Sequence, residues 1–173
     1  MDVLQFGRKV LTDGRRIAVT ETDVLYMREA IEWAKGCSPI SESIPRVGAI
    51  IAVGDKVLGR GRRGTGRKGD DEDAEWHAFQ QVKDKDHLPE ATIYTTLEPC
   101  TPEVRTRPLE CCTELILQHE IRKVFIGILD PNQGVTGKGL CRHLSIFLKE
   151  ICHILQSQRG SQTWLFLLIR RNI

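Results

Sequence analysis

The sequence lacks a long hydrophobic run, a strong net charge and any internal repeat. Its longest late apolar run, Trp164 to Ile169, is far shorter than the roughly 20 residues that a membrane-spanning helix needs, so we expect no segment in a bilayer. The formal net charge of +2 over 173 residues is too small to indicate a class of partner. With 40% apolar and 28% charged residues, the composition predicts one globular domain with a sizeable core.

The sequence also lacks the pattern of a secretory signal. Residues 1–10 do not show a charged start followed by an apolar run, so we expect no signal peptide. The six cysteines are even in number. Without a secretory signal, they predict a reducing, cytoplasmic compartment in which the thiols are free or bound to metal.

Hydrophobic periodicity predicts strands that alternate with helices, an order typical of a layered α/β domain. We expect an N-terminal extension over residues 1–21, as a short hairpin or a loose arm, and a single domain over residues 22–173. A helix should begin near Thr22 or Asp23, either of which can cap it, and stop at Gly36. Gly54-Asp55 suits a tight hairpin turn. The other expected elements are strands over 47–53, 56–60, 91–96, 123–128 and 164–169 and helices over 74–82, 109–120 and 141–156.

Two acidic residues and two separated thiols carry most of the chemical information. Zinc accepts thiolate and carboxylate ligands, and a catalytic zinc keeps a fourth position for water. Such water becomes acidic enough to supply hydroxide near neutral pH, while a carboxylate that is not a ligand can carry protons. Asp73, Cys100 and Cys112 are the predicted ligands. Glu75, two residues beyond a ligand at the start of a helix, is the predicted proton carrier.

Several assignments at this site stay open on the residues alone. Cys112 shares a helical face with more apolar residues than Cys111 does, so Cys112 should turn inward, with Cys111 as the second choice. His77 lies four residues after Asp73 on the same helical face and is an alternative ligand. A structural zinc with four protein ligands, for example Asp73, Cys100, Cys111 and Cys112, ranks last, because adjacent cysteines fit one tetrahedral site poorly.

Four segments, in this order, resemble the zinc-dependent cytidine deaminase-like family. The family carries a His-x-Glu and a Pro-Cys-x-x-Cys signature. The likeness is best in the branch with a longer loop between the cysteines, such as the pyrimidine deaminase domain of riboflavin biosynthesis, and spans about residues 28–144. The segments are Arg46 to Ile51, Ala74 to Ala78, Tyr94 to Thr101, and Val124 to Asn132 with Gly137-Lys138-Gly139.

The resemblance implies a fold, a cofactor and an activity. The implied fold is a three-layer α/β/α sandwich around a mixed sheet of about five strands, with ligands at the N-terminal turns of two neighbouring helices. The implied cofactor is Zn²⁺. The implied activity is hydrolytic removal of an exocyclic amine, with cytosine-type bases favoured, from a nucleobase in a nucleotide, nucleoside or nucleic acid.

The chain departs from the family pattern at two points. The first ligand of the family is usually histidine or cysteine, whereas Asp73 stands here, and eleven residues separate Cys100 from Cys112. Carboxylate oxygen remains an acceptable zinc ligand. The alternative is a catalytically degenerate nucleotide or nucleic-acid binding module with the same fold.

The predicted substrate-binding residues are Arg62, Arg63, Trp76 and Asn132. The cationic, glycine-containing segment from Arg60 to Lys68 could hold a phosphate, and the resemblance implies that a residue near Arg62 or Arg63 touches the substrate. The alternative is a solvated loop whose charge the following acidic run offsets.

Other residues around the expected pocket have weaker assignments. Arg105 and Arg107 could add positive charge on the same side. Trp76 could stack on a base, although helical aromatics are more often core residues. Glu98 should support its loop by hydrogen bonds. The expected partner is a nucleobase-containing substrate, with single- or double-stranded nucleic acid left open. The segment 164–169 closes the sheet or, alternatively, mediates a homo-oligomer.

Overall fold

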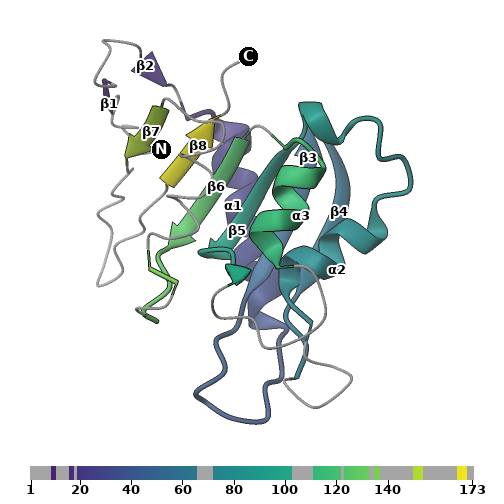
Figure 1. The fold of residues 1–173 in the computed structure, drawn as a ribbon, viewed down its shortest axis with the longest axis vertical. Helices are drawn as coiled ribbons and strands as arrows, with labels where there is room; N and C mark the ends of the chain where they lie inside the picture. The colour runs from purple at the N-terminus through teal and green to yellow at the C-terminus, as the bar shows by residue number, and fades with distance from the viewer. Residues whose placement is uncertain are drawn as a thin grey trace, which may run out of the picture.

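The computed structural model describes residues 9–10, 16–17, 19–65, 72–102, 111–121, 123–132, 135–136, 150–153 and 167–170. These residues form three α-helices, one short 3₁₀ helix and eight strands (Figure 1). The helices are α1 (Glu21–Lys35), α2 (Ala74–Gln81), α3 (Cys112–Gln118) and η1 (Leu88–Glu90). The strands are β1 (Lys9–Val10), β2 (Arg16–Ile17), β3 (Gly48–Val53), β4 (Lys56–Arg62), β5 (Thr92–Leu97), β6 (Lys123–Ile128), β7 (Glu150–His153) and β8 (Leu167–Arg170).

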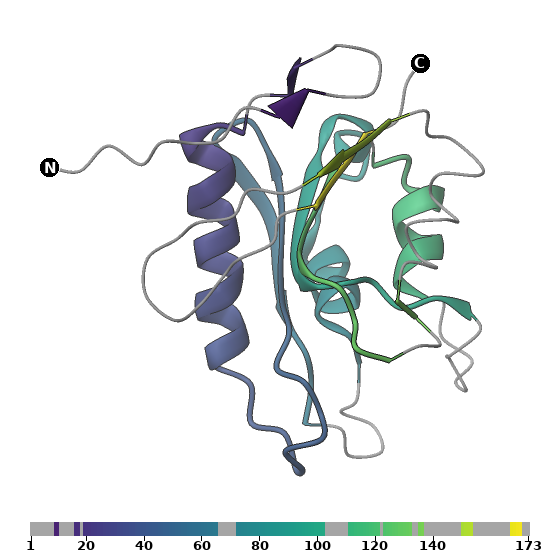
Figure 2. The same ribbon diagram turned by 90° about the vertical axis from the view of Figure 1, so that its left-hand side faces the viewer.

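A mixed six-stranded sheet in the order β4-β3-β5-β6-β8-β7 forms the centre of the fold. Only β5 and β6 run parallel among its strand pairs, and the other neighbours are antiparallel. In Figure 2, α1 covers one face of the sheet, while α2 and α3 cover the other. The predicted three-layer α/β/α sandwich is therefore confirmed, with six strands in place of about five.

The N-terminal pair β1 and β2 forms a separate two-stranded antiparallel sheet. This pairing agrees with the expected short hairpin. The turn expected at Asp13-Gly14 lies outside the described residues. The domain boundary at residue 22 stays a prediction.

Helix α1 begins earlier than the sequence pattern predicted, and the reason is a reciprocal cap. The Thr20 side chain accepts a hydrogen bond from the Asp23 N–H at 3.1 Å, and the Asp23 carboxylate accepts one from the Thr20 N–H at 2.8 Å. This capping box satisfies two N–H groups that the helix itself leaves unpaired. Thr20 is therefore the N-cap, and the assignment to Thr22 or Asp23 was wrong. Gly36 ends the helix as predicted.

Alternation along the strands divides the core into two clusters, one on each face of the sheet. The cluster under α1 combines Met27 and Ala30 with Ile50, Tyr94 and Phe125. The cluster under α2 and α3 contains the buried residues Ala49, Ile51, Ala74, Ala78, Phe79, Ile93, Leu115, Ile116, Val124 and Ile126. The second cluster fixes the two helices whose first residues carry the predicted site.

Glycines on β4 let α2 lie directly on the strand backbone. A Cβ atom at Gly61 would stand 1.9 Å from the Ala74 carbonyl oxygen, and one at Gly59 would stand 2.1 Å from the Ala78 carbonyl oxygen. Any side chain at these positions would push the helix outward. The close approach sets the height at which the first turn of α2 stands above the sheet.

The C-terminal elements correct two expectations. Residues 150–153, expected within a helix over 141–156, form strand β7, because their backbone groups pair with β8. The rest of that expected helix lies outside the described residues. Strand β8 pairs with β6 on one side and β7 on the other. It closes the sheet and leaves no free edge of its own for self-association.

No helix within the described ranges is both long and apolar enough to cross a membrane. Cys37, Cys100, Cys111 and Cys112 are free thiols. Their state agrees with the expectation that the thiols are free or bound to metal.

Candidate metal centre

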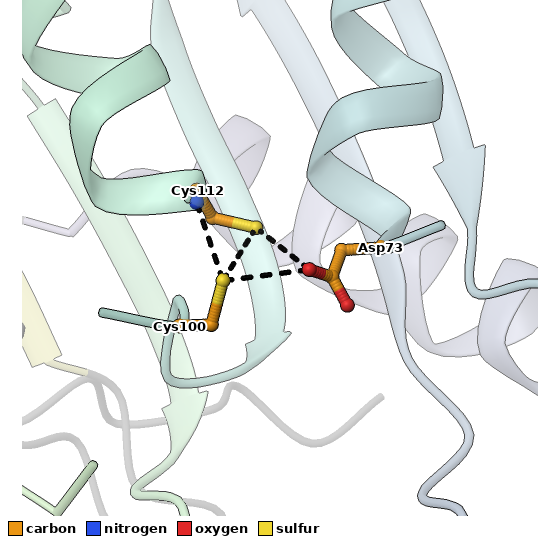
Figure 3. A group of neighbouring side chains, drawn as sticks. All are labelled: Asp73, Cys100 and Cys112. Carbon is orange, nitrogen blue, oxygen red and sulfur yellow. Dashed lines mark hydrogen bonds between the residues drawn. The ribbon is translucent and has the colours of Figure 1, made fainter. Parts of the chain in front are cut away.

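Three side chains from distant parts of the sequence meet at one end of the sheet (Figure 3). Asp73 is the N-cap residue of α2, Cys100 follows β5, and Cys112 is the first residue of α3. The Cys100 and Cys112 sulfurs lie 3.4 Å apart. Asp73 Oδ2 lies 3.4 Å from the Cys100 sulfur and 3.5 Å from the Cys112 sulfur.

The distances in this cluster are close to those around a tetrahedral zinc ion. Zinc binds thiolate at about 2.3 Å and carboxylate oxygen at about 2.0–2.2 Å, so two bound sulfurs stand roughly 3.8 Å apart and a bound sulfur and oxygen roughly 3.5–3.7 Å apart. The sulfur–oxygen separations observed here are 3.4 and 3.5 Å, and the sulfur–sulfur separation of 3.4 Å is shorter than that of two zinc-bound thiolates, so a small outward shift of the sulfurs would admit the ion. Two soft thiolates and one carboxylate are a donor set that zinc accepts, and three protein ligands leave a fourth position open. The residues present therefore fit the group.

The N-terminus of α3 holds the Cys100 loop against the helix. The Cys112 N–H donates to the Cys100 sulfur at 3.3 Å. The Thr113 N–H and hydroxyl donate to the Cys100 carbonyl oxygen at 3.2 and 3.0 Å. The first N–H groups of a helix have no partner within the helix, so they are available for these bonds. Without a metal ion, the hydrogen bond with Cys100 and burial raise the pKa of the Cys112 thiol. Three hydrogen bonds thus tie the Cys100 loop to the start of α3 beside the two sulfurs.

The two adjacent cysteines face different surroundings. Cys111 is the N-cap residue of α3, and its buried sulfur lies 3.1 Å from the Thr113 hydroxyl. Burial raises the pKa of the Cys111 thiol. Within the described residues, the group that could hold a metal contains Cys112 and not Cys111. This geometry supports the preference for Cys112, and it gives no place to Cys111 as a fourth ligand.

Glu75 lies beside the cluster, fully buried in the first turn of α2. Its Oε1 accepts a hydrogen bond from the Thr95 hydroxyl at 2.9 Å, and its Oε2 lies 3.5 Å from the Cys112 sulfur. Burial, with a smaller contribution from the negative charge of Asp73, raises the pKa of Glu75 from 4.5 to about 7. A carboxyl group with such a pKa can gain and lose a proton near neutral pH.

A cavity of about 470 Å³ opens over the cluster and reaches Glu75. Its lining includes Arg63, Asp73, Glu75, Glu98, Cys112 and Asn132. The volume lies in the range of small-molecule sites. The predicted ligands and the predicted proton carrier thus share one cavity.

The four predicted substrate-binding residues separate into two groups. Arg63 and Asn132 line the cavity over the cluster. Arg62 is exposed and lines a second cavity of about 420 Å³ instead. Trp76 packs against the core under α2 and meets the His77 ring edge-on, with ring centroids 5.2 Å apart.

His77, the alternative ligand, also faces away from the cluster. Its Nε2 lies 3.9 Å from a Glu72 carboxylate oxygen, and the residue lines the second cavity. Arg105, Arg107 and Gly137-Lys138-Gly139 lie outside the described residues.

Sequence reasoning missed Thr95 but anticipated the role of Glu98. Thr95 is fully buried in β5, where its hydroxyl lies 2.9 Å from both Glu75 Oε1 and the Leu97 carbonyl oxygen. The sequence of β5 did not single out Thr95, because the strand contains three threonines. Glu98 accepts a hydrogen bond from the Asp130 N–H at 3.4 Å, as expected of a residue that supports its loop.

Known proteins resemble this chain in sequence and in fold. The family model for the cytidine and deoxycytidylate deaminase zinc-binding region matches residues 20–128. The riboflavin biosynthesis protein RibD of Synechocystis is 37% identical over 122 residues, which cover 70% of this chain and 31% of the relative. A Buchnera aphidicola diaminohydroxyphosphoribosylamino-pyrimidine deaminase is 35% identical over 118 residues, which cover 68% of this chain and 75% of the relative.

A solved structure of a similar protein also superposes on this chain. The Thermotoga maritima diaminohydroxyphosphoribosylaminopyrimidine deaminase/5-amino-6-(5-phosphoribosylamino)uracil reductase superposes with a TM-score of 0.57 at 31% identity. The superposition covers 68% of this chain and 32% of that protein. The chain therefore spans about a third of the length of these longer relatives.

Proposed function

Because the chain belongs to the cytidine and deoxycytidylate deaminase zinc-binding family, we propose that it is a zinc-dependent hydrolase that replaces an exocyclic amine of a pyrimidine nucleotide by oxygen. The observation that carries the proposal is the meeting of Asp73, Cys100 and Cys112 beside the buried Glu75 in one cavity. This combination supplies three ligands for a zinc ion and, in Glu75, a carboxyl group that does not bind the ion.

The names of the relatives indicate the substrate class. The Buchnera relative, of which this chain covers 75%, is a diaminohydroxyphosphoribosylamino-pyrimidine deaminase. We propose a substrate of the same kind, in which an aminopyrimidine is attached to a phosphorylated ribose. The reductase activity in the name of the Thermotoga protein is not part of the proposal, because only 32% of that protein is covered.

Asp73, Cys100 and Cys112 would hold the zinc ion, which supplies Lewis-acid activation of water when bound. Glu75 would accept a proton as water adds to the ring carbon that bears the amine, and would return a proton to the departing nitrogen. One water is consumed and one ammonia is released. A positioned carboxyl group of this kind contributes typically 10²- to 10⁴-fold in rate.

Thr95 would keep Glu75 oriented in both protonation states. When Glu75 is ionised, the Thr95 hydroxyl donates to its Oε1. When Glu75 is protonated, the same hydroxyl can turn to the Leu97 carbonyl oxygen at 2.9 Å and accept from the carboxyl group instead. A hydroxyl group can act as donor and acceptor, which suits a residue beside a proton carrier.

Arg63 and Asn132 are the proposed substrate contacts. Both line the cavity, and the buried Nε of Arg63 has no hydrogen-bond partner among the described residues. A buried donor without a partner costs free energy, which a polar substrate atom would recover.

A nucleic-acid substrate is not part of the proposal. The alternative depended on the cationic segment from Arg60 to Lys68, but Arg60 forms an ion pair with Glu29 and Arg62 faces the second cavity. Residues 66–70 lie outside the described part of the chain.

Ammonia release from zinc-loaded protein tests the proposal. The panel contains diaminohydroxyphosphoribosylaminopyrimidine, dCMP, the matching nucleosides and free bases, and single- and double-stranded DNA and RNA. We expect release from a pyrimidine nucleotide and its loss in Glu75→Gln. No release from any compound would refute the activity, and a stable fold that binds no zinc would favour the degenerate binding module.

A further inference from the structure

The Asp73 carboxylate faces two different partners with its two oxygens. Oδ2 lies 3.4 and 3.5 Å from the sulfurs of Cys100 and Cys112, and Figure 3 shows the other oxygen turned away from both sulfurs. That second oxygen, Oδ1, lies 4.0 Å from Nη2 of Arg63. The carboxylate thus points one oxygen at the metal position and the other at a guanidinium group.

The fold holds Arg63 in this place through its backbone. β4 ends at Arg62, and the Arg63 N–H then donates to the Val47 carbonyl oxygen at 2.9 Å. The Arg63 side chain is 24% exposed and that of Asp73 is 15% exposed, so solvent screens this ion pair less than an exposed one. Arg62, one residue earlier, is exposed and lines the other cavity.

The charge of the proposed ligands gives the ion pair between Arg63 and Asp73 an electrostatic role. One carboxylate and two thiolates around a divalent ion leave a net charge of −1, whereas an imidazole in place of the carboxylate would leave zero. The guanidinium group of Arg63, 4.0 Å from Asp73 Oδ1, lies where it can offset this extra negative charge.

We propose that Arg63 is a positioning residue for Asp73: its guanidinium group attracts Oδ1, keeps Oδ2 directed at the metal position and offsets the extra negative charge of a carboxylate ligand. The inference rests on the zinc site of the proposed function, and it adds a role that acts through Asp73. Partners that orient a metal ligand are typically worth about 10- to 100-fold in metal affinity.

A double-mutant cycle on zinc affinity tests this role. The zinc dissociation constant is measured by competition with a chromophoric chelator, under reducing conditions, for the native protein, Arg63→Met, Asp73→His and the double variant. We expect Arg63→Met to raise the constant about 10- to 100-fold in the native background. In the Asp73→His background, which has no carboxylate to orient, it should change little. Equal effects in both backgrounds, or no effect in the native one, would overturn the proposal.

Two further variants separate positioning from charge and from misfolding. Arg62→Met removes the same charge one residue away and should leave zinc affinity unchanged. Arg63→Lys keeps the charge without the planar fork, so its affinity should fall between those of the native protein and Arg63→Met. If Arg63→Met does not fold, the cycle is run with Arg63→Lys, and the same comparison decides.

Cobalt(II) substitution adds a readout that does not depend on activity. The visible bands of the bound cobalt report its ligand geometry, and Arg63→Met should change them only while Asp73 is present. A native protein that binds no zinc would end both this proposal and the proposed function. Zinc binding that is insensitive to Arg63 would end this proposal alone.

Discussion

Glu75→Gln should stabilise the zinc-free protein at alkaline pH and leave its stability unchanged in acid. Glutamine has nearly the shape of glutamate, and its side-chain oxygen can still accept the hydrogen bond that Thr95 donates at 2.9 Å. The substitution therefore removes little except the negative charge. That charge is fully buried and lies close to a second acid, Asp73.

The magnitude follows from the pKa of Glu75, which burial raises from 4.5 to about 7. Below pH 4.5 the carboxyl group is protonated in the folded and the unfolded chain, so its ionisation does not change the free energy of unfolding. Between pH 4.5 and 7 the unfolded chain releases a proton that the folded chain keeps, and the free energy of unfolding falls as pH rises. Above pH 7 the loss is complete, at roughly 3 kcal/mol.

Urea unfolding of both proteins measures this difference from pH 5 to 8.5, with a chelator and a reducing agent present. The variant should gain stability relative to the native protein as pH rises, up to roughly 3 kcal/mol. The exposed Glu90→Gln is the matched control and should stay within about 0.5 kcal/mol of the native protein at every pH. A difference that does not vary with pH, or a less stable variant at pH 8, would refute the reasoning. With zinc and substrate, Glu75→Gln should lower kcat about 10²- to 10⁴-fold.

Three other predictions concern the ligands and the packing that supports them. Cys112→Ala should lose bound zinc while Cys111→Ala keeps it, as elemental analysis of the purified variants will show; the reverse result would make Cys111 the ligand. Gly61→Ala places a Cβ 1.9 Å from the Ala74 carbonyl oxygen, and should cost about 1–3 kcal/mol in chemical unfolding and weaken zinc binding; unchanged affinity would contradict the role of this contact. Tyr94→Phe removes a 2.7 Å hydrogen bond to a carboxylate of α1, and should cost about 1.5–3 kcal/mol with zinc content unchanged; a loss of zinc would show coupling across the sheet.

The sequence predicted those features well that depend on residues close together in the chain. Gly54-Asp55 forms the turn between β3 and β4, where Gly54 has a φ of 53°, a conformation that few other residues tolerate. Gly36 ends α1 as predicted, with a φ of −74° that other residues also adopt. The predicted β-rich runs and helical stretch located β5, β6 and α2 to within about two residues. The three predicted ligands are also brought together, since each stands at the start of a helix or the end of a strand.

Contacts between distant segments were not predictable from one sequence. The period of β4 could not decide which of Arg62 and Arg63 faces the metal position, because the strand ends there and the chain turns. Thr95 gave no signal of its contact with Glu75, twenty residues away in sequence. The strand at residues 150–153 has a helical pattern, yet pairing with β8 decides its conformation.

X-ray absorption at the zinc edge tests the central claim, that Asp73, Cys100 and Cys112 bind one zinc ion. The account predicts about one zinc per chain, two sulfur neighbours at about 2.3 Å and the remaining neighbours as oxygen at about 2.0–2.2 Å. A third sulfur would indicate that Cys111 binds as well, and scattering from an imidazole ring would indicate His77. Either result, or protein without zinc, would contradict the account.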